Sequence, residues 1–317
     1  MVIVAEERAS RPNQFDIESG AEPVCPFCEG NESMTPGEIT AFRKNKPDLP
    51  GWTARTVPNL YPAVVRSVED FSVDASQWTS SPAVGTHEVI VDTPRHILSV
   101  AEMTGSEVET MFGMYAARLR ALRSEGRFVS VMIFKNVGQA AGASLQHSHS
   151  QLIALPFIPE SLRSELDHAA TYEECPWCDM LQAEFQSGVR IVEETERFVA
   201  LCPFVSRFPA EVAVWPKRHK QYFDELSDDE LAEYARLLRR TIRRLEKSVP
   251  WIKCRLAYNV ILSTAPLLRE EFRQYHLRFS ILPSLSRAAG FEWGTGLHIN
   301  PISPETAAAR LRAAKAE

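Results

Sequence analysis

The chain has 317 residues, of which 44% are hydrophobic and 24% are charged, and its formal net charge is -6 at pH 7. A negative balance disfavours a large nucleic-acid surface, and no apolar run reaches the roughly 18 residues of a membrane span. The N-terminus lacks a basic region followed by a long apolar core, so we expect no signal peptide and a cytoplasmic protein. The length suits one large domain or two ordinary ones.

Four of the six cysteines form two Cys-x-x-Cys pairs, Cys25/Cys28 and Cys175/Cys178. Each pair encloses a proline and an aromatic residue, which predicts a turn-like setting. A reducing compartment argues against disulfides. Two thiolates in a tight turn supply half of a tetrahedral zinc site, and the cysteines alone do not complete it.

The two halves of the chain share one order of features. A strand-like run ending in proline and histidine follows each cysteine pair, over residues 88–96 and 211–219. A capping box begins eight residues after each of these histidines, at Thr104 and at Ser227, and opens an amphipathic helix. Another apolar strand follows each helix, and a last strand contains a histidine and ends in Leu-Pro.

This order predicts an α+β fold built from two tandem copies of one module, each an antiparallel sheet with a helix packed on one face. We place the first module at residues 1–156 and the second at residues 157–317. The two modules are expected to share a continuous sheet or to pack face to face. The charged stretch 160–186 has the composition of a helix that could bridge them.

The segment 146–151 reads Gln-His-Ser-His-Ser-Gln and leads into an apolar run. On a strand, alternate residues share a face, so His147, His149 and Gln151 would project together. A neutral imidazole can attack an α-phosphorus and hold a nucleotidyl group, while an amide such as Gln151 can donate to a phosphoryl oxygen. The small residues 142–144 leave room for a phosphate near the backbone, and Ser144 could donate to it. A metal pair or hydrogen-bonded core histidines are the alternatives.

Four further segments are specific in sequence: residues 25–32, residues 57–64, residues 134–136 with 140–145, and residues 290–296. Together with His-x-His-x-Gln they resemble the galactose-1-phosphate uridylyltransferases, a family of the histidine-triad superfamily with two modules per chain. The resemblance extends from about residue 2 to about residue 309. ADP-glucose phosphorylase, a close relative in that family, has essentially the same motifs.

The resemblance implies a ping-pong reaction in which His149 is the nucleophile. UDP-glucose would uridylylate His149 and release glucose 1-phosphate, and galactose 1-phosphate would then take the UMP. The remaining substrate contacts that it implies are Gln151 and Ser144 at the phosphates, Arg8 and Arg11 near them, Asn59 and Asn136 at the nucleotide, and Phe291 and Glu292 at the sugar. Guanidinium groups suit phosphate oxygens because their N–H donors form a fork.

The resemblance also implies two sets of zinc ligands, and we expect one to two zinc ions per chain. The first set is Cys25, Cys28, His96 and His147, and the second, as in plant-type relatives, is Cys175, Cys178, His219 and His276. Counted back from Leu-Pro, His276 matches His149 rather than His147, so superposition of the two sites would require a register slip or a bulge. The second half has no His-x-His, and we assign it no catalysis of its own.

One departure from the family stands in the motif itself. Ser148 occupies the position where many relatives have proline, and we expect activity to survive because the alternation of side chains is kept. His87, His168 and His298 are interpreted as ordinary polar residues.

Three functions remain to be distinguished. The first is uridylyl transfer between hexose 1-phosphates, and the second is adenylyl transfer from ADP-glucose to inorganic phosphate. The third is a zinc-stabilised nucleotide-binding protein without turnover, which the intact His149 and Gln151 disfavour. Family members are commonly homodimers whose active sites can borrow residues across the interface, so we expect a homodimer.

Overall fold

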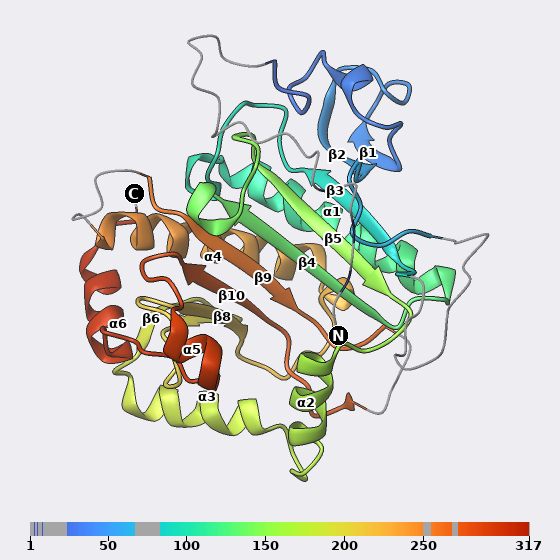
Figure 1. The fold of residues 1–317 in the computed structure, drawn as a ribbon. Helices are drawn as coiled ribbons and strands as arrows, with labels where there is room; N and C mark the ends of the chain where they lie inside the picture. Colours follow the sequence, from blue (N-terminus) through green and yellow to red (C-terminus); the bar gives the residue numbers. More distant parts are fainter. Residues whose placement is uncertain are drawn as a thin grey trace.

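The computed structural model describes residues 3, 5, 8, 24–66, 83–249, 255–267 and 272–316. Its centre is one ten-stranded antiparallel sheet with the order β1-β2-β3-β5-β4-β9-β10-β8-β7-β6 (Figure 1). The strands of the first half are β1 (Thr40–Arg43), β2 (Trp52–Pro58), β3 (Thr86–Val91), β4 (Ser130–Val137) and β5 (His149–Leu155). Those of the second half are β6 (Ile191–Glu194), β7 (Phe198–Leu201), β8 (Val212–Pro216), β9 (Tyr258–Ser263) and β10 (Arg278–Pro283).

The strand order repeats between the halves. The first half is ordered 1-2-3-5-4 and the second 6-7-8-10-9, and the halves meet where β4 pairs with β9. The prediction of two tandem α+β modules is therefore confirmed, and the modules share a continuous sheet. The boundary that we predict after residue 156 falls between β5 and the helix α2 (Glu160–Ala169).

Two long helices, α1 (Gly105–Glu125) and α4 (Asp228–Ser248), cover the same face of the sheet (Figure 1). Both predicted capping boxes are present, at Thr104 with Glu107 and at Ser227 with Glu230. Each box satisfies N–H groups that a helix start leaves without partners. The predicted apolar stripes are buried in a single core: Val108, Met111, Tyr115, Leu119 and Leu122 of α1, and Leu231, Tyr234, Leu238, Ile242 and Leu245 of α4.

The stretch 160–186 forms two helices rather than one, α2 and α3 (Pro176–Ser187). Cys175 is the N-cap residue of α3 and Pro176 opens the helix, because its fixed φ is already helical. The turn-like setting predicted for the second cysteine pair is therefore wrong, whereas Cys25 and Cys28 do lie in consecutive turns.

The other helices whose bounds lie within the described residues are short. They are α5 (Gly290–Thr295) and α6 (Pro304–Ala313), with the 3-10 helices η3 (Glu32–Met34), η4 (Val100–Glu102), η5 (Gln139–Ala141) and η6 (Phe223–Glu225). No helix in the described part of the chain is long and apolar enough to span a membrane.

Candidate active site and metal clusters

Strand β5 begins at His149 and lies between β3 and β4. His147 precedes the strand, so the shared strand face that we predicted for three residues holds only for His149 and Gln151. These two residues pair with Val91 and Val89, which pack with the Cys25–Cys28 loop rather than with α1. The nucleophile candidate therefore lies on the side of the sheet opposite the long helices.

The His149 ring is held in one orientation by its own backbone. Its Nδ1 lies 2.7 Å from the carbonyl oxygen of His147, and because a carbonyl can only accept, Nδ1 carries the proton. The lone pair then resides on Nε2, which is the nitrogen available for attack on phosphorus. The Phe27 ring packs beside the imidazole, with 5.2 Å between ring centroids. The sequence indicated only a turn at Phe27, yet this residue joins the cysteine loop to His149.

A buried ion pair lies beneath His149. The Lys135 ammonium donates to Asp92 Oδ2 at 2.6 Å, to Ser148 Oγ at 2.7 Å and to the His149 carbonyl at 3.0 Å. Ser150 Oγ donates to the other Asp92 oxygen at 2.9 Å. Burial lowers the pKa of Lys135, and the charge of Asp92 opposes that effect. The pair thus fixes the backbone on both sides of His149, and Ser148 supplies a bond that a proline could not make.

Sequence reasoning missed this pair, although a signal was present. Lys135 stands inside the apolar strand β4, and Asp92 directly follows the fully buried strand β3. A charge inside an apolar strand needs a partner, because an unpaired buried charge is strongly unfavourable. Two opposite charges placed in this way, one in each of two apolar segments, indicate that they form an ion pair with each other.

Gln151 meets a histidine that the sequence left without a role. Its Oε1 lies 3.0 Å from Nε2 of His87, on the neighbouring strand β3. The backbone N–H of Ala63 donates to the other ring nitrogen, Nδ1, at 3.0 Å. His87 and Gln151 are both buried.

The loop after β2 brings a second group of predicted residues to His87. Asn59 Nδ2 lies 3.0 Å from His87 Nε2, and Asn59 Oδ1 accepts from the backbone N–H of Tyr61 at 2.9 Å. Arg8 donates to the Tyr61 carbonyl at 2.7 Å. The structure therefore joins Arg8, Asn59 and Gln151 in one chain of contacts through His87. Arg11 lies outside the described residues.

Asn136 lies where the two halves of the sheet meet. It pairs in register with Asn259 of β9, whose amide donates to Asn136 Oδ1 at 2.8 Å. The same amide donates to the Ala141 carbonyl at 2.9 Å. The second half thus contributes Asn259 to the site region, a contact that the sequence did not suggest.

The small-residue loop before β5 differs from the prediction. The backbone N–H groups of Ala141, Gly142 and Ala143 donate to carbonyls of Gly138 and Gln139 within the loop. The expectation that this stretch offers its N–H groups to a phosphate is therefore wrong for Gly142 and Ala143. Gly138 has a φ of +80°, and a Cβ there would come within 2.9 Å of Ala257. Partly buried Ser144 lies between this loop and β5.

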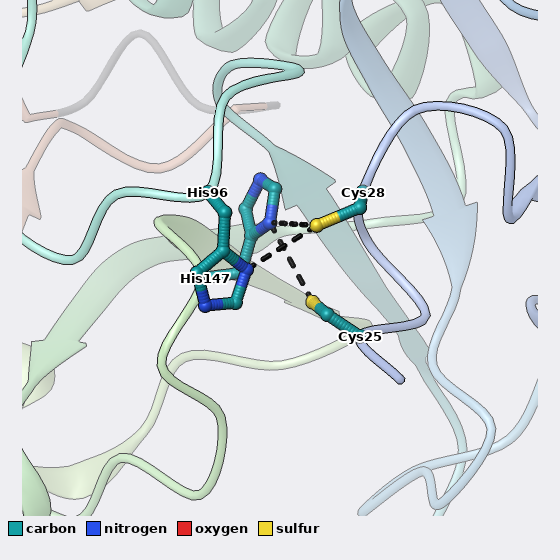
Figure 2. A group of neighbouring side chains, drawn as sticks. All are labelled: Cys25, Cys28, His96 and His147. Atoms are coloured by element: carbon teal, nitrogen blue, oxygen red, sulfur yellow. Dashed lines mark hydrogen bonds between the residues drawn. The ribbon is translucent and has the colours of Figure 1, made fainter. Parts of the chain in front are cut away.

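Figure 2 shows the two thiols of Cys25 and Cys28 facing the rings of His96 and His147. All four candidate ligand atoms lie within 4.8 Å of one another. The Sγ–Nδ1 distances are 3.2 Å for Cys28 to His96 and 3.6 Å for each cysteine to His147. A tetrahedral zinc with bonds of about 2.3 Å to sulfur and 2.0–2.1 Å to nitrogen has an S–N edge of about 3.6 Å. The group therefore has the dimensions of a zinc site.

The state of His147 suits metal binding. Its Nε2 donates to the Thr93 carbonyl at 2.8 Å, which leaves the lone pair on Nδ1 facing the sulfurs. Burial lowers the pKa of His147 to about 4, so the ring is neutral. A ligand histidine whose other nitrogen donates to a carbonyl is the usual second-layer support of a metal site.

The second half contains an equivalent group. Its Sγ–Nδ1 distances are 3.7 Å for Cys175 to His276, 3.5 Å for Cys178 to His276 and 3.6 Å for Cys178 to His219. All four ligand atoms again lie within 4.8 Å of one another. Both groups can therefore hold a metal ion.

His276 corresponds to His147, not to His149. Its Nε2 donates to the Pro216 carbonyl at 3.1 Å, as that of His147 does to Thr93, and each histidine lies two residues before its strand. The count from Leu-Pro misleads because Pro283 is the last residue of β10, whereas Pro156 follows the end of β5. The register difference therefore lies in the strands and their far ends, not at the metal ligands.

The predicted sugar residues lie elsewhere. Phe291 and Glu292 belong to α5, where Glu292 accepts from the backbone N–H of Ala289 at 2.9 Å. Asn300, just beyond α5, donates to the carbonyl of Ser206 at 3.0 Å, and Figure 1 draws α5 near α6, within the second half. Within the described residues of one chain, no contact brings Phe291 or Glu292 to His149.

Comparison with known proteins agrees with this architecture. Residues 1–159 match the family model described as galactose-1-phosphate uridyl transferase, N-terminal domain. ADP-glucose phosphorylase of Arabidopsis thaliana is 33% identical, over 98% of this chain and 89% of its own length. Galactose-1-phosphate uridylyltransferase of Thermotoga maritima is 30% identical, over 100% of this chain and 96% of its own length.

Solved structures give the same result in three dimensions. The Arabidopsis thaliana ADP-glucose phosphorylase with bound ADP-glucose superposes with a TM-score of 0.80 at 30% identity, covering 96% of this chain and 92% of its own. A uridylyltransferase structure superposes with a TM-score of 0.81 at 29% identity, covering 99% and 94%. The motifs, the doubled module and these full-length matches agree, and the chain belongs to the galactose-1-phosphate uridylyltransferase family of nucleotidyltransferases.

Proposed function

We propose that the protein transfers a nucleoside monophosphate from a nucleotide sugar through a covalent bond to His149. The observation that carries this proposal is the hydrogen bond from His149 Nδ1 to the His147 carbonyl, because it leaves the lone pair on Nε2. In the first step Nε2 attacks the α-phosphorus, and the bond from that phosphorus to the sugar phosphate breaks. The hexose 1-phosphate leaves with the electron pair. A phosphate oxygen of the acceptor then attacks the same phosphorus and breaks the P–N bond.

The other predicted residues receive roles in the same reaction. Gln151, next to His149 on the same strand face, donates to a phosphoryl oxygen as negative charge develops there. Ser144 is the second phosphate donor. The contacts around His87 and Asn259 support three further roles: Asn59 and Asn136 at the nucleotide, and Arg8 at the phosphates. Arg11 is proposed to join Arg8 at the phosphates on the family resemblance alone.

Uridylyl transfer is the first candidate, with UDP-glucose as donor and galactose 1-phosphate as acceptor. The matching family model and the full-length match to the Thermotoga maritima uridylyltransferase support it. Adenylyl transfer from ADP-glucose to inorganic phosphate is the second candidate. It is supported by the 33% identity to ADP-glucose phosphorylase and by the likeness to that enzyme with bound ADP-glucose.

Both cysteine–histidine groups are proposed to hold zinc. Two thiolates and two imidazoles at these spacings suit a closed tetrahedral ion, which supplies structural cross-linking when bound and leaves no open position for substrate. Through Phe27 and His147, the first site holds the two segments that flank the nucleophile.

We propose a cytoplasmic homodimer in which α5 of one copy serves the site of the other. Phe291 is 51% exposed and Trp293 80% exposed, and Leu297 and Ile299 are exposed beside them. An exposed apolar group of this kind suits a protein interface. Mixing inactive His149→Gly and Glu292→Ala proteins should restore part of the activity if the sites are shared between copies, and none if each copy acts alone.

The main test uses UDP-glucose and ADP-glucose, each labelled in the phosphate next to the nucleoside and incubated separately with the protein. We expect an acid-labile adduct from UDP-glucose and an equal amount of released glucose 1-phosphate. An adduct from ADP-glucose alone would establish the second candidate. No adduct from either donor, or an adduct that persists in His149→Gly, would overturn the proposal.

A further inference from the structure

We infer that His87 is a positioning residue that fixes which end of the Gln151 amide faces the transferred phosphoryl group. This inference rests on the proposed function. His87 lies on β3 and is buried, and it pairs with Ile153, two pairs along from the Val89–Gln151 pair and therefore on the same strand face. It has no place among the substrate contacts or the metal ligands assigned above.

The tautomer of His87 follows from a backbone contact. The N–H of Ala63 can only donate and lies 3.0 Å from Nδ1, so Nδ1 carries the lone pair. In the neutral ring the proton is then on Nε2, which lies 3.0 Å from Gln151 Oε1. The His87 Nε2–H therefore donates to Gln151 Oε1. The NH2 group of Gln151 then faces away from His87.

Asn59 tests this assignment, because its Nδ2 also lies 3.0 Å from His87 Nε2. Two donors cannot bond to each other, so either the Asn59 contact or the Ala63 contact is not a hydrogen bond. The backbone N–H of Ala63 donates to the ring itself and cannot reorient, so this contact decides the tautomer, and the Asn59–His87 contact is then not a hydrogen bond.

The consequence for Gln151 concerns charge. An amide presents either a donor or an acceptor depending on which way it is turned. A turned Gln151 would bring its oxygen toward the phosphoryl oxygens and would also oppose its own NH2 to the His87 N–H. His87 disfavours that orientation of the Gln151 amide. The Gln151 NH2 group therefore points toward the phosphoryl oxygens before negative charge develops on them, as electrostatic catalysis requires.

Two substitutions of similar size separate the donor from the rest of the ring. His87→Gln can keep a donor near the position of Nε2, whereas the shorter His87→Asn keeps polar atoms near Nδ1 and cannot reach Gln151. We expect His87→Asn to slow single-turnover formation of the nucleotidyl-enzyme by roughly 10- to 100-fold. The Kd for the nucleotide sugar should change little, and His87→Gln should retain a rate within about 5-fold of the wild-type rate.

A double-mutant cycle distinguishes positioning from a general structural role. If His87 acts through Gln151, then His87→Asn should slow the reaction by less than about 2-fold in a Gln151→Leu background. The same 10- to 100-fold loss in both backgrounds, or equal rates for His87→Asn and the wild type, would overturn the inference. Failure of the proposed function looks different, because the wild-type protein itself would then form no adduct. If His87→Asn does not fold, His87→Phe, which fills the ring volume without either nitrogen, replaces it in the same cycle.

Discussion

The two halves of the sheet keep the same metal cluster and differ at the residue that follows it. His147 and His276 occupy equivalent positions, since each donates to a backbone carbonyl and each lies two residues before its strand. Two residues further along, at the start of the strand, stands His149 in the first half and Arg278 in the second. Their polar atoms even contact the same group, the carbonyl of the cluster histidine, at 2.7 Å for His149 and 3.5 Å for Arg278.

Arg278 cannot repeat the chemistry of His149. A guanidinium stays protonated and has no lone pair with which to attack phosphorus. Its charge is balanced by Glu165 of α2, and its flat face lies over the rings of Trp177, Trp215 and Tyr275. The two halves therefore share the metal-ligand geometry, and the residue two positions after the cluster histidine is the one that we propose separates the catalytic half from the other.

The largest expected effect separates these two residues. His149→Gly should lower turnover by at least about 10⁴-fold, because the covalent step is lost, while metal content and Tm stay near those of the wild type. Arg278→Met should leave turnover within about 3-fold of the wild type. Steady-state assays and elemental analysis of both variants provide the measurement, and free imidazole added to His149→Gly with UDP-glucose should partly restore release of glucose 1-phosphate by forming nucleotidyl-imidazole in solution. Equal losses of turnover in His149→Gly and Arg278→Met would contradict the proposal that only the first half carries the reacting residue.

The next effect concerns what the halves share. His147→Ala and His276→Ala should each reduce the metal content from two ions per chain to one, and each should lower the free energy of unfolding by about 4 kcal/mol or more. Activity should fall strongly only with His147→Ala, because only that cluster adjoins the nucleophile. Elemental analysis with denaturant unfolding checks both statements. An unchanged metal content in either variant would refute the corresponding cluster.

The buried ion pair sharpens the comparison, because both of its residues, Lys135 and Asp92, belong to the first half. Lys135→Met leaves Asp92 buried without its cation and should lower the free energy of unfolding by about 3–5 kcal/mol. Combining Lys135→Met with Asp92→Asn should recover part of that loss. Arg236→Met is the matched control, because it breaks an exposed ion pair with Glu109 that is worth about 0–1 kcal/mol. Both free energies of unfolding are measured with denaturant. Equal decreases in Lys135→Met and Arg236→Met would contradict the larger contribution proposed for the buried pair.

The smallest effect compares the two helix caps. Hydrogen bonds from Arg95 lower the pKa of Glu107 to about 2, against an ordinary value of 4.5. A lowered pKa stabilises the fold above the ordinary value, and this contribution is lost as the pH falls from 4.5 towards 2. Glu107→Gln should therefore lower the free energy of unfolding by about 1 kcal/mol at pH 7 and by less at pH 3.5.

Glu230 caps the other helix and provides the control. Burial opposes its ionisation, yet the Ser227 N–H and Lys220 keep its pKa below the ordinary value. Glu230→Gln should follow the same pH trend with a smaller amplitude. A destabilisation by Glu107→Gln that grows as the pH falls would have the wrong sign for this account.

Features that depend on near neighbours were the ones predicted well. Both capping boxes join residues three apart, and both apolar stripes follow from helical spacing, so the helices α1 and α4 could be read directly. The metal ligands and His149 were identified because their motifs resemble those of a known family. The strand registers were harder, and the Leu-Pro count failed because β5 and β10 end differently around their prolines.

The contacts that position the site residues join segments far apart in the sequence, so they could not be predicted from local spacing. His87 meets Gln151 across 64 residues of sequence, and Lys135 meets Asp92 across 43. Such pairs depend on which strands become neighbours in the sheet. The local patterns in a single sequence do not reveal that strand order. The resemblance identified Phe291 and Glu292 by their motif. It did not indicate whether they contribute to the site of their own chain or to that of a second copy.

The central pairing of β4 with β9 has a consequence for the history of the chain. A molecule reduced to its first half would leave the whole length of β4 as an open edge, with N–H and C=O groups ready to pair with any passing strand. It would also lose the Asn259 amide that ties Asn136 to the Ala141 carbonyl. The second half thus covers the β4 edge, and a chain shortened at the module boundary should aggregate as well as lose the Asn259 contact.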